Sequence, residues 1–508
     1  MPGRHTGQCS PRRLELLEQT ETCPLLARVE APDGQYRRAR AVPSMGPGGG
    51  AVDRGSGRSC YGLARSAPVR NARGARDPTH EPVPRAPELY GDGMRIGDLE
   101  GEKVGICVSG GLDSKSVTAR LIEAGVDVVG FTADLAQPDE DDIEDIPRRM
   151  APSGAETRIV DLKDSMAKAA MLVIRAQARY DGGYWNTTGI ARAVTVHGLL
   201  GAMQAEGCTV LAHGATGRGN DQLRFERYTN VLAPEMMVYA AWRDPELLEQ
   251  FPGRREMAAY LLEKGIEAST GPAKRYSTDA NLAGLSHEAE DLESLETPAT
   301  IVQPTMGVWP QDAPDRVETV RMRFQSGTCV ELNGKALGPY DLLRAANDVA
   351  GRNGVGISNA LENRIIGTKS RGVYEAPGME LLGTGLAAVY QAVLDRRATA
   401  LFRQLSSLVS DHIYDGRLFD PAPRAAIAAI DVMAANASGT VELGLYKGSL
   451  IFQQLTDVPA SLYNPADASM EASDGLNPIS SQGFVEVQSA EAVAMARAGQ
   501  IVAPAWEE

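Results

Sequence analysis

The sequence predicts an α/β protein in which a parallel-sheet domain is followed by an α+β domain and a C-terminal helix. Between Lys103 and Trp242, short apolar runs alternate with helical patterns, and this alternation is typical of a parallel sheet. Past about Gly271 the pattern changes to pairs of strands with turn residues between them. Aromatic residues make up only 5% of the chain, which suits an α/β protein better than an all-β one.

The first domain is predicted to hold five parallel strands with helices between them. The strands are expected at Val104–Val108, Val126–Phe131, Arg158–Leu162, Val210–His213 and Met236–Tyr239. The helices are expected at Ser116–Ala124, Asp142–Met150, Ser165–Arg179, Ala191–Ala205 and Gln222–Val231. Right-handed crossovers would place these helices on both faces of the sheet. Ligands bind such sheets at the carboxyl ends of the strands, where this sequence has the polar segments 109–114, 132–137 and 214–221.

The second domain is predicted to contain antiparallel hairpins and a long helix. The expected strands are Val317–Phe324 with Cys329–Leu332, ahead of the turn at Asn333-Gly334, and Thr440–Lys447 with Ser449–Gln454, joined at Gly448. The long helix is expected at Gly378–Leu401 and a final helix at Ser489–Arg497. We therefore expect a first domain at 94–275, a second at 276–487 and a C-terminal helix with a tail at 488–508.

Residues 1–93 differ in composition from the rest of the chain. They are rich in Arg, Pro, Gly and Ser, with a helix-like pattern only around Leu14–Leu17, and this composition predicts disorder. They contain 14 Arg and no Lys against 10 acidic residues, so the leader superficially resembles a transit peptide. Met94 opens a segment that leads directly into the first predicted strand, which suggests the hypothesis that the start codon is assigned too far upstream.

Composition limits the classes of partner. The net charge of the 508 residues is −15, and the negative excess lies beyond residue 93. Nucleic acid is therefore a disfavoured partner. A local basic pocket for a small anion is compatible with this overall negative charge. No apolar run approaches the roughly 20 residues of a membrane span. Six cysteines stand at 9, 23, 60, 107, 208 and 329, without the close pairs typical of zinc or redox sites. We expect a reduced, cytoplasmic setting and no protein metal site.

The segment Ser109–Ser114, which we name the glycine loop, lies between a predicted strand and a predicted helix. Gly110 and Gly111 let a ligand approach the backbone, two serine hydroxyls add donors, and the helix N-terminus favours an anion. This pattern indicates a phosphate site; an ordinary strand-to-helix turn with a serine cap is the alternative. The Walker pattern is excluded because Ser114 and Ser109 occupy its two glycine positions before Lys115. The dinucleotide fingerprint fails at Gly217-Arg218-Gly219, since its third glycine would fall on Gln222.

A second polar cluster lies at Gly214–Asp221. Asp221 and Arg224 would share a helix face, and such a pair could hold a zwitterion, with the carboxylate on an amine and the guanidinium on a carboxylate. The alternatives are a surface ion pair and a glycine loop in which Asn220 or Asp221 caps a helix.

Two further clusters lie around the second domain. Tyr276–Asn281 with Ser286–Glu288 could bind a polar substrate between domains, or could consist of ordinary loop formers. Glu362–Arg364 with Lys369–Glu375 could belong to the same site or form structural salt bridges. His213 and His287 lie too far apart in sequence to predict a metal site, and His287 is as well explained as a structural loop residue as it is as a catalyst.

These motifs together carry a resemblance. The glycine loop looks like that of the ATP-pyrophosphatase (PP-loop) superfamily, which has an adenine-nucleotide alpha-hydrolase-like fold. Taken with Phe131–Asp134, Trp185–Thr188, His213–Asp221, Tyr276–Asn281 and Glu362–Glu375, it resembles the argininosuccinate synthase family over residues 100 to 490. That resemblance implies ligation of citrulline to aspartate through citrullyl-AMP in arginine biosynthesis, with release of AMP and pyrophosphate. It also implies magnesium with ATP, and a homotetramer.

The resemblance assigns roles residue by residue. Asp113, Asp221 and Arg224 are the expected catalytic residues. The expected ATP-binding residues are Cys107, Val108, Ser109, Gly110, Gly111, Leu112, Asp113, Ser114, Lys115, Ala133, Gly214, Thr216, Asp221, Ser277 and Asp279. Thr216, Asn220 and Asp221 match the aspartate site. The positions that match the citrulline site are Tyr184, Asn220, Arg224, Ser286, Glu288, Glu362 and Tyr374.

Lys115 departs from the family, which usually has serine there. A cation at a helix N-terminus opposes the helix dipole by about 0.3 to 1 kcal/mol, so Lys115 either grips pyrophosphate or points to solvent in an altered site. Two rival functions therefore stay open. One is a paralogous adenylating ligase with another ureido acid or amine, and the other is a non-catalytic ATP-binding homologue.

Overall fold

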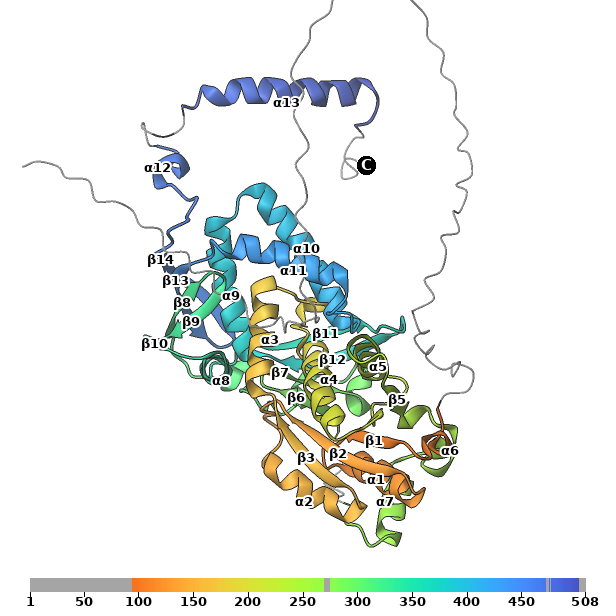
Figure 1. Ribbon diagram of the computed structural model, residues 1–508. Coiled ribbons are helices and arrows are strands. Elements are labelled where there is room, and N and C mark those ends of the chain that lie inside the picture. Colours follow the sequence, from red (N-terminus) through yellow and green to blue (C-terminus); the bar gives the residue numbers. More distant parts are fainter. Residues whose placement is uncertain (1–93, 269–274, 472–474, 476, 502–508) are drawn as a thin grey trace, which may run out of the picture. The chain divides into compact units, whose positions relative to one another are not determined.

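The computed structural model describes residues 94–268, 275–471, 475 and 477–501; the predictions for residues 1–93 fall outside this part. The first sheet is built from β1 (Lys103–Cys107), β2 (Asp127–Asp134), β3 (Glu156–Asp161), β4 (Val210–His213) and β5 (Met237–Ala240). All its paired strands are parallel, in the order β3-β2-β1-β4-β5 (Figure 1). The predicted parallel sheet is confirmed, with strand ends displaced by at most three residues.

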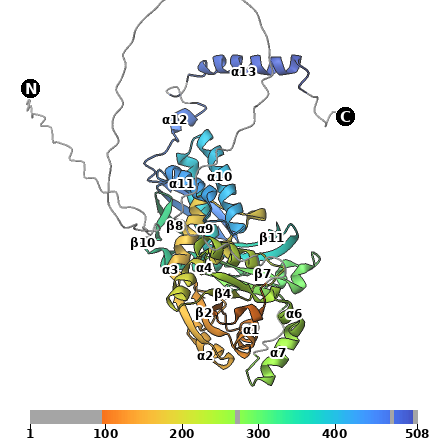
Figure 2. The ribbon, with the colours of Figure 1, turned by 45° about the vertical axis from the view of Figure 1, so that its right-hand side comes forward.

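Helices cover both faces of this sheet, because neighbouring residues of a strand point to opposite sides. On β4, Val210 and Ala212 pack in one core while Leu211 packs in another. The first core includes side chains of α1 (Leu112–Glu123), α2 (Ile146–Met150), α6 (Pro245–Gln250) and α7 (Arg254–Glu263). The second includes α4 (Thr187–Ala205) and α5 (Asp221–Leu232), while α3 (Lys163–Ala176) joins a third, larger core. Figures 1 and 2 show α1 and α7 side by side.

The strand order creates a switch point between β1 and β4. The chain runs outward from β1 to β3, crosses through α3 and α4, and returns to β4 on the other side of β1. Helices that leave neighbouring strands in opposite directions open a crevice at the carboxyl ends of those strands. The glycine loop follows β1 and the 214–221 segment follows β4, so both polar segments leave from this point.

The second half of the chain contains two antiparallel sheets. One has the order β11-β12-β7-β6, and the other β10-β9-β8-β13-β14. Their strands are β6 (Ser277–Asn281), β7 (Gly284–Glu288), β8 (Glu318–Gln325), β9 (Thr328–Leu332), β10 (Lys335–Ala336), β11 (Ile357–Asn363), β12 (Lys369–Glu375), β13 (Gly439–Tyr446) and β14 (Ser449–Thr456). Both predicted hairpins are confirmed. Positive φ angles at Asn333-Gly334 and Lys447-Gly448 are those that two-residue turns between twisted strands require.

The predicted helix Gly378–Leu401 is wrong as a single element. The structure has α9 (Pro377–Val393) and α10 (Arg396–Tyr414), separated at Leu394 and Asp395. The Asp395 carboxylate accepts hydrogen bonds from the amides of Arg397 and Ala398 at 2.7 and 2.9 Å, which starts a new helix. Apolar spacing continues across the break, so periodicity alone did not reveal it. The chain also forms α8 (Pro339–Gly351), α11 (Pro421–Ala434) and α12 (Pro465–Ala468).

The C-terminal helix α13 (Ser480–Arg497) begins earlier than the predicted Ser489. None of its side chains is buried, and Phe484, Val485 and Val487 are 69%, 56% and 69% exposed. No helix in the described part of the chain has the length and apolar character needed to cross a membrane.

Candidate active site

The glycine loop is held from both sides by hydrogen bonds. The amide of Val108 donates to Phe131 O on β2 at 2.9 Å, and Thr132 Oγ1 donates to Val108 O at 2.8 Å. Within the loop, the amide of Ser109 donates to Ser114 Oγ at 3.0 Å. Gly111 is the N-cap of α1 and supplies no side-chain cap, so the first amides of the helix are available to an anion.

Burial shifts the pKa values of two ionisable groups in this region. Burial raises the pKa of the Asp113 carboxyl, although Arg254 opposes the rise. Burial also raises the pKa of the Cys107 thiol to about 12. The thiol therefore stays protonated at neutral pH, which argues against Cys107 as a nucleophile.

Lys115 is turned into the protein. The residue is only 5% exposed, and its Nζ donates to Glu267 O, beyond the end of α7, at 3.1 Å. The hypothesis that Lys115 points to solvent is therefore wrong. Burial lowers its pKa, in opposition to the attraction of Glu267. In this position Lys115 joins the start of α1 to the segment that follows α7.

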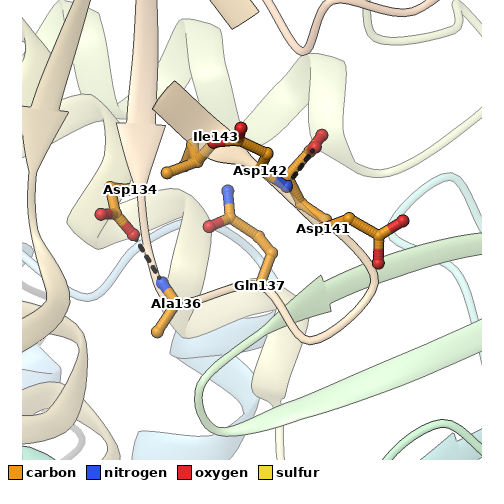
Figure 3. Close-up of a pocket in the computed structure, with 7 residues that line it drawn as sticks. Asp134, Ala136, Gln137, Asp141, Asp142 and Ile143 are labelled. Atoms are coloured by element: carbon orange, nitrogen blue, oxygen red, sulfur yellow. Dashed lines mark hydrogen bonds between the residues drawn. The ribbon is translucent and has the colours of Figure 1, made fainter. Parts of the chain in front are cut away.

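An acidic cavity of about 250 Å³ adjoins the carboxyl end of β2. Figure 3 shows the side chains that line it, with the Asp134 carboxylate accepting from the amide of Ala136. Gln137 donates to Ala133 O at 2.9 Å, so the cavity begins beside Ala133, an expected ATP contact. Its remaining lining residues are Glu140, Asp141, Asp142 and Ile143.

Asp221, the first residue of α5, lies at the centre of a partly buried ion network. Its carboxylate binds Arg224 Nη1 at 2.8 Å and Arg192 Nη2 at 2.9 Å. Arg192 Nη2 also lies 2.7 Å from Asp279 Oδ2 on β6. The Arg224 side chain is only 4% exposed, so the predicted Asp221–Arg224 pair is not a surface ion pair. Burial opposes ionisation of Asp221, but Arg192 and Arg224 outweigh it and hold its pKa below the usual range.

A second buried cluster is formed by Glu362 and tyrosines. Tyr374 Oη donates to Glu362 Oε2 at 2.8 Å, and Tyr414 Oη donates to Glu362 Oε1 at 2.7 Å. The Tyr184 ring stacks on that of Tyr374 with centroids 4.1 Å apart, and the Tyr180 ring stacks on that of Tyr414 at 3.7 Å. Burial raises the pKa of Glu362, while the two hydroxyl donors act against this rise.

Tyr414 joins the two clusters. Asn220 Nδ2 donates to Tyr414 Oη at 2.8 Å, and Arg224 Nε donates to Tyr414 O at the same distance. The carboxylates of both clusters act on Glu288. Burial is the main cause that raises the pKa of Glu288 to about 7, followed by the charges of Glu362, Asp221 and Asp279. The result is one continuous region that holds both carboxylates and guanidinium groups, the two charges that can pair with a zwitterionic ligand.

The other predicted site residues border this region. Ser286 lies buried on β7, and its hydroxyl reaches Asp279 O at 3.5 Å. Ser277 is exposed and opposes Glu288 across the β6–β7 pair. Gly214 and Thr216 lie in the exposed loop after β4, and Thr216 O accepts from the amide of Gly219 at 3.2 Å.

The two histidines that the sequence singled out have structural surroundings. His213 is 1% exposed, and burial, reinforced by Arg243, lowers its pKa to about 3. His287 is buried on β7, with Nε2 2.7 Å from Glu375 Oε1. Within residues 94–268, 275–471, 475 and 477–501, no three His, Cys, Asp or Glu side chains are grouped as metal ligands would be.

Sequence reasoning missed Arg192 and Tyr414. Arg192 is the single charged residue of the largely buried helix α4, and a lone cation in such a helix is a usable signal, because it needs a buried partner. Tyr414 is the last residue of α10, and it went unnoticed because α10 itself was not predicted.

Comparison with known proteins extends over nearly all of the described chain. The family model described as the N-terminal HUP domain of arginosuccinate synthase matches residues 103–267, and that of the C-terminal domain matches residues 276–495. The curated argininosuccinate synthase of Rhodopirellula baltica is 37% identical over 385 residues, which are 75% of this chain and 95% of the relative. That of Idiomarina loihiensis is 37% identical over 391 residues, 76% of this chain and 96% of the relative.

Proposed function

The chain belongs to the argininosuccinate synthase family, and we propose that it ligates citrulline to aspartate through citrullyl-AMP, as a step of arginine biosynthesis. Members of this family are ATP-dependent ligases. The observation that carries the proposal is the continuity of the site: Tyr414 joins the Asp221 network to the Glu362 cluster. Arg192 extends the same region to Cys107, two residues before the glycine loop, since its charge acts on that thiol.

In the first half-reaction, the ureido oxygen of citrulline attacks the α-phosphorus of ATP and pyrophosphate leaves. The glycine loop and the uncapped start of α1 receive the polyphosphate, because their amides and the helix dipole favour an anion. The cavity beside Ala133 follows β2, which pairs with β1, the strand ahead of the loop. No covalent enzyme intermediate is needed, and catalysis depends on positioning and on charge stabilisation.

Magnesium fits this site as a partner of ATP. Mg²⁺ usually keeps several waters and binds through phosphates with one or two carboxylates, without a protein cage. Asp113, at the start of α1, is the carboxylate of the glycine loop and would hold the ion together with the phosphates. The ion would neutralise charge on the polyphosphate.

The amino acids are assigned to the two clusters. Glu362 and Glu288 are carboxylates suited to the citrulline ammonium, and Tyr374, Tyr184, Asn220, Arg224 and Ser286 surround them. Aspartate lies against Thr216, Asn220 and Asp221. In the second half-reaction its amine attacks the activated ureido carbon, and AMP leaves with the oxygen that citrulline contributed.

The test of this function is an omission experiment. The protein is incubated with ATP, citrulline and aspartate, and AMP and pyrophosphate are measured with each amino acid left out in turn. We expect both products and argininosuccinate with the complete mixture, and no sustained AMP release without aspartate. AMP release only with a different acceptor or amine would instead identify a paralogous ligase.

Citrulline binding is expected to strengthen as pH rises through about 7. The pKa of Glu288 is raised to about 7, so the carboxylate that attracts the citrulline ammonium forms above that pH. Affinity should increase about tenfold between pH 6 and 8, in proportion to the ionised fraction of Glu288.

The raised pKa of Glu288 also lowers the free energy of unfolding as pH rises from about 4.5 to 7, since the folded protein holds a proton that the unfolded chain has lost. In titration calorimetry, the citrulline affinity of Glu288→Gln should not change between pH 6 and 8. A pH dependence equal to that of the parent would contradict the role assigned to Glu288 in citrulline binding.

The non-catalytic alternative rests on Lys115, and its position in the structure gives a direct test. Because Lys115 Nζ bonds to Glu267 O, we expect Lys115→Ser to weaken the contact between α1 and the segment after α7. Its melting temperature should fall while its rate of AMP release stays within severalfold of the parent. Activity that appears only in Lys115→Ser would favour the non-catalytic homologue.

We further propose a cytoplasmic homotetramer. The exposed apolar side chains of α13 support association, since unpartnered apolar residues on a long helix favour burial against another chain. Cys107, Cys208 and Cys329 are free thiols, in keeping with a reducing compartment. Light scattering should give a mass of four times 54.1 kDa, and a monomer mass would contradict the proposal.

A further inference from the structure

Arg149, on the short helix α2, reaches the glycine loop although no sequence pattern pointed to it. Gly110 has a φ of +74°, and a Cβ added there would lie 3.3 Å from Arg149 Cζ and 3.5 Å from Arg149 Nε. The guanidinium therefore occupies the space beside Gly110 that a side chain would fill. It lies directly against the backbone that is expected to receive phosphate.

Two acidic residues hold this guanidinium without saturating it. Glu140 Oε1 lies 2.8 Å from Nη2, and Asp145 Oδ2 lies 3.7 Å from Nε. Both nitrogens are buried, yet among the described residues neither has a partner in hydrogen-bonding geometry. Buried donors that lack a well-aligned acceptor are costly, and an anion at the glycine loop would satisfy them.

The neighbouring Arg148 provides a contrast. Its side chain is 79% exposed, and it donates to both oxygens of Asp145, from Nε at 2.5 Å and from Nη2 at 2.8 Å. Asp145 is thus the bidentate partner of Arg148 and supplies only a distant charge to Arg149. Two arginines that are adjacent in sequence therefore differ in burial and in unused donors.

Lys115 does not supply the cation that the loop needs, because its Nζ bonds to Glu267 O. Arg149 lies close enough that its charge contributes to the lowered pKa of Lys115, after burial. With Lys115 turned away, Arg149 is the cation that borders the space beside Gly110. A guanidinium matches phosphate oxygens bidentately, and it is always charged.

We propose that Arg149 forms a pyrophosphate subsite, binding the β- and γ-phosphates of ATP and the pyrophosphate that leaves. This proposal rests on the proposed function, in which pyrophosphate leaves when citrulline attacks ATP. As the bond from the ureido oxygen to the α-phosphorus forms, the bond from that phosphorus to the bridging oxygen breaks. The electron pair stays on the bridging oxygen, so negative charge develops on the β-phosphate, next to the guanidinium. A fixed cation at that place stabilises the transition state.

The test compares Arg149→Met with Arg148→Met, which removes the same charge from the adjacent position. We expect Arg149→Met to raise the KM for ATP and the inhibition constant of inorganic pyrophosphate at least about tenfold, the value of one charge-assisted contact. The KM values for citrulline and aspartate should stay within about twofold. Arg148→Met should match the parent in all four constants. An unchanged pyrophosphate constant in Arg149→Met would overturn the proposal, as would equal effects of the two substitutions.

A second variant and a second measurement cover the other outcomes. Arg149→Lys keeps the charge but loses the planar fork, and it replaces Arg149→Met in the test if Arg149→Met does not fold. Arg149→Lys should weaken pyrophosphate binding about threefold or more. Binding as tight as in the parent would overturn the proposal. Calorimetric titration of pyrophosphate into parent and Arg149 variants needs no turnover. If the parent binds pyrophosphate more tightly than the variants yet forms no argininosuccinate, the subsite stands and the proposed function fails.

Discussion

Asp221→Asn is expected to destabilise the protein by about 3 to 5 kcal/mol and to lower kcat/KM for aspartate at least about a hundredfold. Asp221 is the shared partner of Arg192 and Arg224, and removing one member of a buried ion pair leaves the other charge uncompensated. Arg192 would keep Asp279, whereas Arg224 would lose its ion pair and keep the carbonyl oxygen and ring of Tyr414. Urea denaturation and steady-state kinetics measure the two effects.

The matched control is Glu226→Gln on the same helix. Glu226 pairs with Arg243 at 2.7 Å, but the Arg243 side chain is 37% exposed, so its loss should cost less than about 1 kcal/mol and leave the kinetic constants unchanged. Equal losses from the two substitutions would mean that the Asp221 network is not the buried core of the site. A stable Asp221→Asn with normal aspartate kinetics would contradict both the stability and the function assigned to Asp221.

The loops of the site were predictable because parallel strands bring their carboxyl ends to one edge. The apolar runs before Ser109 and Gly214 each predicted a buried strand, and strands of that kind do not occur alone. The rule that ligands bind at the carboxyl ends of such strands then places both loops at one edge of the sheet, while the adjacency of β1 and β4 comes from the structure. The glycine loop and the Asp221 segment could therefore be placed near each other from the sequence.

The partners of these loops could not be predicted in the same way. Arg192 comes from α4, Tyr414 from the end of α10 and Arg149 from α2, and each reaches the site through tertiary packing rather than through a local pattern. The missed break at Asp395 shows the limit: a short polar side chain competed with helix continuation, although the apolar periodicity ran on. The error displaced Tyr414 from any predicted element and hid its contact with Glu362. The bond from Lys115 to Glu267 O is likewise a tertiary contact that no local pattern predicts.

Gly110→Ala is expected to lower kcat/KM for ATP about a hundredfold. At a φ of +74° an alanine is strained by about 1 to 2 kcal/mol, and its Cβ would lie 3.3 Å from Arg149 Cζ, closer than an ordinary contact. The backbone must shift or the guanidinium must move, and either change takes donors away from the phosphates. Loss of one preorganised donor to developing charge costs about a hundredfold or more in rate. Initial rates at varied ATP concentration measure the effect.

Gly125→Ala separates backbone strain from loss of the site. Gly125 follows the same helix, α1, with a φ of +80°, and a Cβ there meets nothing within 4 Å. Both substitutions should therefore lower the free energy of unfolding by a similar amount, since both place alanine in the left-handed region. Gly110→Ala alone should lose ATP affinity. If Gly125→Ala weakened ATP binding equally, the effect would arise from strain in α1 and not from the contact between Gly110 and Arg149. If neither substitution weakened ATP binding, the glycine loop would not hold the phosphates, because glycine is required there for an anion to approach the backbone.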